Sequence, residues 1–114
     1  MDTIKYGYLV APTKNSRRGV VTVVVNRPGK DDLDQVHTAS FAFCSPKDSF
    51  RKDRGRQIAL SRLKLGKLTV NFVHAGTLSQ AVEKAIAEVA SQHHLPNWLN
   101  RALSKKTIKF GLRN

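Results

Sequence analysis

The run from Val20 to Val25 is built of β-branched residues, which pack well on a pleated surface. It predicts the best-buried strand of a sheet. Apolar and aromatic residues from Ile4 to Val10 predict a strand before it, and alternation from His37 to Cys44 predicts a third. Polar segments rich in turn residues, Lys14–Gly19 and Arg27–Asp32, separate the three runs. The first part of the chain is therefore expected to form three antiparallel strands.

The segment Ser45–Asp48 has the chemistry of a helix start. Its serine can cap the free amides, its proline suits the first helical position, and its aspartate can reach back as in a capping box. We expect this helix to extend to about Lys64 and to stop at Gly66 in a left-handed conformation. Alternation from Leu68 to Val73 then predicts a fourth strand.

A second helix is predicted after the capping box Thr77–Gln80. Its apolar residues recur at helical spacing on one stripe. They are Leu78, Ala81, Val82, Ala85, Ile86 and Val89. Pro96 ends this helix, a short third helix carries Trp98, and Thr107–Leu112 predicts a closing edge strand. The order βββ-α-β-α-α-β favours one α+β domain over residues 1–114, with a mainly antiparallel sheet and the helices packed on one face.

The charge balance constrains function more than any motif. Twenty Lys and Arg stand against eight Asp and Glu, a formal net charge of +12. Such an excess repels itself, and it is typical of proteins whose partner is a polyanion or an anionic ligand. A plain solubility charge is the alternative.

Cys44 is the only cysteine, which excludes an intramolecular disulfide and a cysteine-based zinc site. We find no apolar run of about 20 residues and no basic-then-apolar order of a signal peptide at the N-terminus. A cytoplasmic protein is therefore expected, in the cytoplasm of the host if the chain is encoded by a phage.

The segment from Lys47 to Lys67 concentrates positive charge. Its cations are Lys47, Arg51, Lys52, Arg54, Arg56, Arg62, Lys64 and Lys67. On a helical wheel Arg56 falls inside an apolar arc, which is costly unless the guanidinium meets an anion. A glycine inside a helix, such as Gly55 beside it, is best explained by the close approach of another backbone or a ligand. Gly55 and Arg56, with Arg62 further along, are the best candidates for a ligand-facing site. The alternative is that Gly55 admits a crossing helix and Arg56 reaches the surface along its aliphatic stem.

Further cations lie at turns and on the last helix. Arg17, Arg18 and Arg27 flank the predicted strands, and Arg51 and Lys52 belong to the basic segment; cations at such places often contact phosphates, although solvated loop charges fit as well. Arg101, Lys105 and Lys106 form a third basic edge. Trp98 or Phe72 could stack on a base, with a role as core anchor the alternative for Trp98.

Few residues of the sequence suggest a catalytic site. Asp31, Asp32 and Asp34 cluster in a turn, where local turn bonds are the commoner role. The neighbours His93 and His94 point about 100° apart on a helix, which makes a poor metal pair. We recognise no P-loop, no G-x-G-x-x-G and no H-E-x-x-H. We therefore expect no enzyme, no cofactor and no metal.

The run from Cys44 to Phe50, followed by Gly55-Arg56-Gln57-Ile58-Ala59 and Arg62-Leu63, resembles a K-D-x-F…G-R-x-I-A-x-x-R-L pattern of small phage and prophage proteins. Among these it resembles the Thoeris anti-defence nucleotide sponges, which sequester cyclic ADP-ribose-type signals and related cyclic oligonucleotides. The resemblance implies a non-catalytic, nucleotide-binding homo-oligomer with pockets between subunits. Sponges hold phosphates with arginines and clamp the base. From chemistry and rough position, not from a matched motif, we assign these roles to Arg27, Arg56 and Arg101 and to Phe72.

Two other functions remain open. Three strands followed by a helix also resemble the arm-binding domains of phage integrases, whose sheet enters the major groove. A nucleic-acid-binding protein of that kind explains the charge directly, because its affinity grows with the number of phosphates contacted. The other is a phage inhibitor of a host nucleic-acid enzyme, whose basic face would occupy the enzyme's substrate channel.

Overall fold

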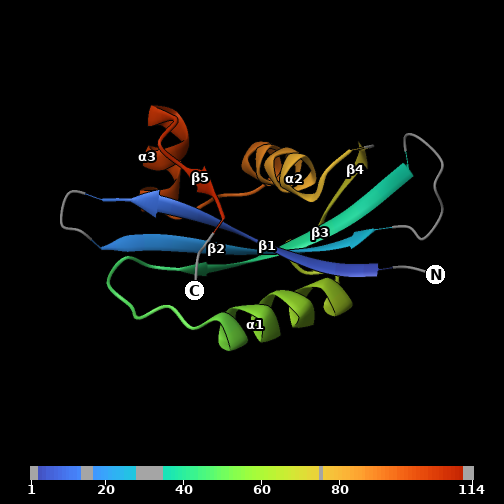
Figure 1. Ribbon diagram of the computed structural model, residues 1–114, viewed down its shortest axis with the longest axis horizontal. Helices are drawn as coiled ribbons and strands as arrows, with labels where there is room; N and C mark the ends of the chain where they lie inside the picture. Colours follow the sequence, from blue (N-terminus) through green and yellow to red (C-terminus); the bar gives the residue numbers. More distant parts are fainter. Residues whose placement is uncertain (1–2, 14–16, 28–34, 75, 112–114) are drawn as a thin grey trace.

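The computed structural model describes residues 3–13, 17–27, 35–74 and 76–111. The described residues form five strands and three helices in the predicted order (Figure 1). The strands are β1 (Thr3–Pro12), β2 (Arg18–Arg27), β3 (Gln35–Cys44), β4 (Val70–His74) and β5 (Lys109–Phe110). The helices are α1 (Lys52–Leu65), α2 (Leu78–Gln92) and α3 (Asn97–Lys105). The predicted α+β class is confirmed.

The strands form one antiparallel sheet in the order β4-β3-β2-β1-β5. β1 and β2 pair along their whole length, from Thr3 opposite Arg27 to Pro12 opposite Arg18. β5 adds only two residues to the outer edge of β1. Because β1, β2 and β3 follow each other as neighbours, the end of β1 and the start of β2 lie at the same end of the sheet as the end of β3 (Figure 1).

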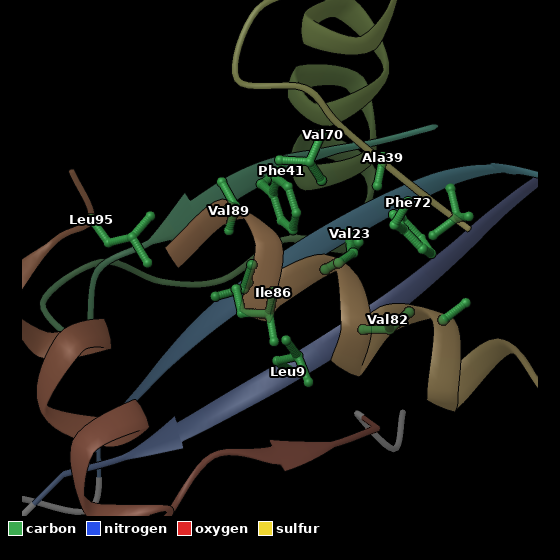
Figure 2. Close-up of a cluster of buried hydrophobic side chains, with 14 of the residues drawn as sticks. Leu9, Val23, Ala39, Phe41, Val70, Phe72, Val82, Ile86, Val89 and Leu95 are labelled. Atoms are coloured by element: carbon green, nitrogen blue, oxygen red, sulfur yellow. The ribbon is translucent and has the colours of Figure 1, made fainter. Parts of the chain in front are cut away.

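The larger core lies between one face of the sheet and helices α2 and α3. Alternate residues of the central strands, such as Val23 on β2 and Phe41 on β3, point toward Val82 and Val89 of α2 (Figure 2). The apolar stripe predicted for α2 is buried here, with Leu78 packed at its edge. Leu95, just before α3, extends this core toward the third helix.

The second core lies on the opposite face, beneath α1. Val24 and Ala42 of the sheet pack against Ala59 of the helix, and Tyr6 and Leu63 border this cluster. The expectation that all helices pack on one face is therefore wrong, because α1 covers one face while α2 and α3 cover the other (Figure 1). Strand residues i and i+1 point to opposite faces, so the valines of β2 supply both cores.

The start of α1 also differs from the prediction. The amide of Asp48 donates to the carbonyl of Ser45 at 3.0 Å, which closes a turn, and the helix begins only at Lys52. Serine followed by proline suits the first positions of a β-turn as well as a helix start. The predicted stop is confirmed, because Gly66 is left-handed with φ 69° and its amide bonds to the carbonyl of Leu63.

The remaining boundaries agree more closely with the sequence. The capping box of α2 is complete: the hydroxyl of Thr77 accepts from the amide of Gln80, whose side chain accepts from the amide of Thr77. β4 begins at Val70 rather than Leu68, whose φ is 52°. The predicted turn residues 28–32, Asp34 and Leu112 lie outside the described residues. No helix in the described part of the chain is both long and apolar enough to cross a membrane.

Candidate anion-binding furrow

Gly55 lies where α1 comes closest to the sheet. A Cβ atom added to Gly55 would lie 2.4 Å from the Oγ1 of Thr22 on β2, far inside van der Waals contact. Thr22 is 1% exposed, and its buried hydroxyl has no hydrogen-bond partner among the described residues. Gly55 therefore lets the helix backbone rest on the strand, a close approach that larger residues prevent.

Arg56 interacts with two aromatic rings of β1. Its Nε donates to the hydroxyl of Tyr8 at 2.5 Å, and its guanidinium lies 5.1 Å from the ring centroid of Tyr6 and 5.8 Å from that of Tyr8. The negative face of an aromatic ring attracts a cation. This explains how an arginine lies beside an apolar arc without an anion. The side chain remains exposed, so its role toward a ligand stays a prediction.

Three other predicted site residues make contacts within the protein. Arg62 donates to the backbone carbonyl of Phe41 at 2.8 Å, beyond the point where β4 stops pairing with β3. Arg27 donates to the carbonyl of Gly76 at 2.9 Å. Phe72 is 5% exposed and stacks on His37 with ring centroids 5.5 Å apart. Phe72 belongs to the core. The expectation that it clamps a base is wrong, because a buried ring cannot stack on one.

The residues that the sponge resemblance combines do not meet in this fold. Arg27 ends β2 at the end of the sheet near the start of α2. Arg101 lies on α3, at the other end of the sheet (Figure 1). Arg56 lies on the opposite face from α3. One chain therefore does not bring Arg27, Arg56 and Arg101 around one ligand.

The structure instead gathers other cations around the end of the sheet that holds the β1–β2 loop. A hollow of about 520 Å³ between α3 and the end of β1 is lined by Thr13, Trp98, Arg101 and Lys105. A second hollow, of about 560 Å³, shares Thr13, Trp98 and Arg101 with the first. It continues to residues of the two loops at this end, namely Arg17, Ser45, Pro46 and Lys47.

Two more hollows carry this path to the other face. The third, of about 560 Å³, is lined by Arg17, Arg18 and the segment Pro46–Phe50. The fourth, of about 280 Å³, shares Asp48–Phe50 with the third and lies against Thr22 and the first turns of α1. It is also lined by Cys44, Arg51, Arg54, Gly55 and Ile58. Because each hollow shares lining residues with the next, they form one path from α3 around the strand ends to α1. We call this path the furrow.

The furrow is strongly positive. Its cations are Arg17, Arg18, Lys47, Arg51, Arg54, Arg101 and Lys105. Among the described residues, Asp48 is the one carboxylate that lines it. The guanidinium of Arg51 contacts Asp53 at 3.1 Å, but both side chains are more than two-thirds exposed, so this pair contributes little. Cations that line one path with little opposing charge favour binding of an anion.

Two aromatic residues interrupt the row of cations. Trp98 lines the first two hollows and packs against Gly19 of β2, where an added Cβ would lie 2.3 Å from the indole ring. It therefore both anchors the core and borders the furrow. Phe50 lines the last two hollows and packs edge-on against Tyr8, with ring centroids 6.0 Å apart. Each ring is only partly buried.

Cys44 has little of the character of a nucleophile. Burial, with the nearby carboxylate of Asp48 as a second cause, raises the pKa of its thiol. A raised pKa leaves less of the reactive thiolate at neutral pH. In the described part of the chain no three His, Cys, Asp or Glu residues are grouped as metal ligands would be. Binding by charge and stacking is the chemistry that this arrangement supports.

Sequence reasoning named Arg17, Arg18, Arg51 and Arg101 but did not place them together. The signal that could have done so is the strand order, since a three-strand meander brings its first loop beside the end of its third strand. No known protein family, curated protein or solved structure matches the chain. Function is therefore inferred from the furrow.

Proposed function

We propose that this chain is a non-catalytic nucleic-acid-binding protein that contacts phosphates along the furrow. The observation that carries the proposal is the continuity of the furrow, which is lined by seven cations and one carboxylate. Each phosphate that a Lys or Arg neutralises releases condensed counterions, so affinity grows with the number of phosphates in reach. Cations spread along an open path suit a chain of phosphates better than a compact ligand.

A second candidate is the sequestration of a small signalling nucleotide, such as a cyclic ADP-ribose isomer or a cyclic oligonucleotide. The α1 end of the furrow favours it. That hollow, of about 280 Å³, combines Arg51 and Arg54 with the partnerless hydroxyl of Thr22. Small-ligand pockets are usually about 300–1,000 Å³ in volume and carry a few well-placed polar groups. A small nucleotide held there would contact few of the remaining furrow cations.

Two triple variants test the proposal. The furrow variant Arg17→Gln, Arg18→Gln, Lys47→Gln removes three charges from the middle of the path. The control variant Lys5→Gln, Lys64→Gln, Lys67→Gln removes three exposed charges that do not line it. Both lose the same net charge, so a difference between them reports position.

Affinity for a labelled 20-nucleotide DNA is measured by fluorescence anisotropy at about 100 mM salt, with unlabelled cyclic nucleotides as competitors. We expect the furrow variant to bind at least about tenfold more weakly and the control to stay within about threefold of the parent. Equal losses in the two variants would contradict binding along the furrow. Tight binding of a cyclic nucleotide with none of DNA would replace the proposal by the second candidate.

A further inference from the structure

We infer, on the basis of the function proposed above, that the furrow binds a single strand of nucleic acid rather than a duplex. The first argument is the path. The furrow begins beside α3, passes Thr13 just after β1 and Arg17 just before β2, and finishes beside α1. Helices α3 and α1 lie on opposite faces of the sheet (Figure 1). A ligand that fills it must turn around the end of the molecule.

A duplex resists that turn. The molecule measures 44 × 27 × 27 Å along its principal axes, so the turn is completed within the thickness of a small domain. The persistence length of duplex DNA is about 150 base pairs, so even a smooth bend of about 40–90° within 20–30 base pairs is unfavourable. A single strand bends at every nucleotide. Only the flexible strand can meet Arg101 on one side and Arg54 on the other.

The second argument comes from the two aromatic rings. Trp98 lies among Arg17, Arg101 and Lys105 in the α3 half of the furrow. Phe50 lies among the cations of the α1 half. Partly exposed rings between cations are the usual arrangement for single-strand binding, where bases stack on the aromatic rings. In a duplex the bases are already stacked on each other and cannot reach these rings.

The test uses Trp98 as a reporter, because it is the only tryptophan of the chain. Intrinsic fluorescence and anisotropy are followed during titration with single-stranded DNA, single-stranded RNA and duplex DNA of the same length. We expect either single strand to bind at least about tenfold more tightly than the duplex. We also expect the single strand to quench the fluorescence of Trp98, since a stacked base lies against the indole.

Variants at the two ends of the furrow test whether one bound strand contacts both ends. Arg101→Gln and Arg54→Gln are both expected to weaken binding of a 20-nucleotide strand, while Lys64→Gln serves as the exposed control on α1. A strand too short to span the furrow should respond to only one of the two variants. All of these side chains are exposed, so the fold should survive each change; the thermal melt of each variant checks this.

The outcomes separate this inference from the proposed function. Equal or tighter binding of the duplex would overturn the single-strand inference and leave nucleic-acid binding standing; the exposed Gln57 and Ser61 of α1 would then be examined for groove contacts. Single-strand binding without quenching of Trp98 would overturn the stacking argument. Failure of every nucleic acid to bind would overturn both proposals.

Discussion

At the scale of single residues, Gly55 and Gly19 let the helical layers approach the sheet closely. Gly55 faces Thr22 beneath the sheet, and Gly19 faces Trp98 above it. In each case the added Cβ would lie within 2.4 Å of a side-chain atom. Backbone conformation is not the reason, because neither glycine has a positive φ. Space is the reason, and it makes both positions sensitive to a single methyl group.

Replacement of Gly55 by alanine separates packing from helix propensity. In an isolated helix the change would stabilise by about 1 kcal/mol. Here we expect a net destabilisation of about 1–3 kcal/mol, because the methyl group meets the Oγ1 of the buried Thr22. The measurement is the free energy of unfolding from urea titration of Gly55→Ala, Thr22→Ala and the double variant. The loss from Gly55→Ala should shrink in the Thr22→Ala background; an equal loss there would contradict the contact.

Cys44 offers a readout of the furrow near α1. Because burial, aided by Asp48, raises the pKa of its thiol, less thiolate is present at any given pH than in the unfolded chain. Alkylation by iodoacetamide at pH 8 should therefore be slower in the folded protein, and Asp48→Asn should speed it by lowering the pKa. Cys44 lines the last hollow, so bound nucleic acid should slow the reaction further. Mass spectrometry follows the rate; a rate that does not respond to Asp48→Asn would contradict the contribution of Asp48 and leave burial as the cause of the raised pKa.

At the scale of elements, local chemistry was predictable where one structure satisfies it. Gly66 ends α1 and the Thr77–Gln80 box begins α2 as predicted. The helix start predicted at Ser45–Asp48 was wrong because these residues suit both a turn and a helix start. The chain closes a turn there, and the helix begins at Lys52. A propensity that favours both a turn and a helix cannot locate a boundary.

The sequence of β2 does indicate that helices cover both faces of the sheet. The run Val20–Val25 of β2 holds five valines and Thr22 with no apolar–polar alternation, and nearly continuous apolar runs are typical of strands covered on both faces. Val23 packs in the core under α2, while Val24 packs against α1. The alternation of strands and helices alone does not tell which face each helix covers, because short connections can lead to either.

The N-terminus of α2 yields the prediction at this scale. Thr77→Ala removes the acceptor for the amide of Gln80 and breaks the capping box. We expect the variant to lose about 1 kcal/mol of stability, whereas Thr77→Ser, which keeps the oxygen, should lose much less. Thermal and urea unfolding of the pair measure this. An equal loss in both variants would mean that the methyl group, and not the hydroxyl, stabilises the helix start.

At the scale of the whole molecule, the candidate site is assembled from segments far apart in the chain. The β1–β2 loop contributes Arg17, the β3–α1 connection contributes Lys47, and α3 contributes Arg101. The sequence indicated cations in each segment, but only the strand order brings the two loops together, and only the packing of α3 places Arg101 beside them. Composition predicted an anionic partner; tertiary structure was needed to find the path.

The salt dependence of binding measures how much of that path a strand occupies. For single strands the logarithm of the binding constant falls with the logarithm of salt concentration by about 0.7 per phosphate contact. If all seven furrow cations engage, the slope should be about −5, and the variant Arg17→Gln, Arg18→Gln, Lys47→Gln should reduce it to about −3. The control variant Lys5→Gln, Lys64→Gln, Lys67→Gln should keep the parent slope. A parent slope near −1 would mean that only one or two cations contact the ligand, which would favour a small nucleotide in the α1 hollow over a strand along the furrow.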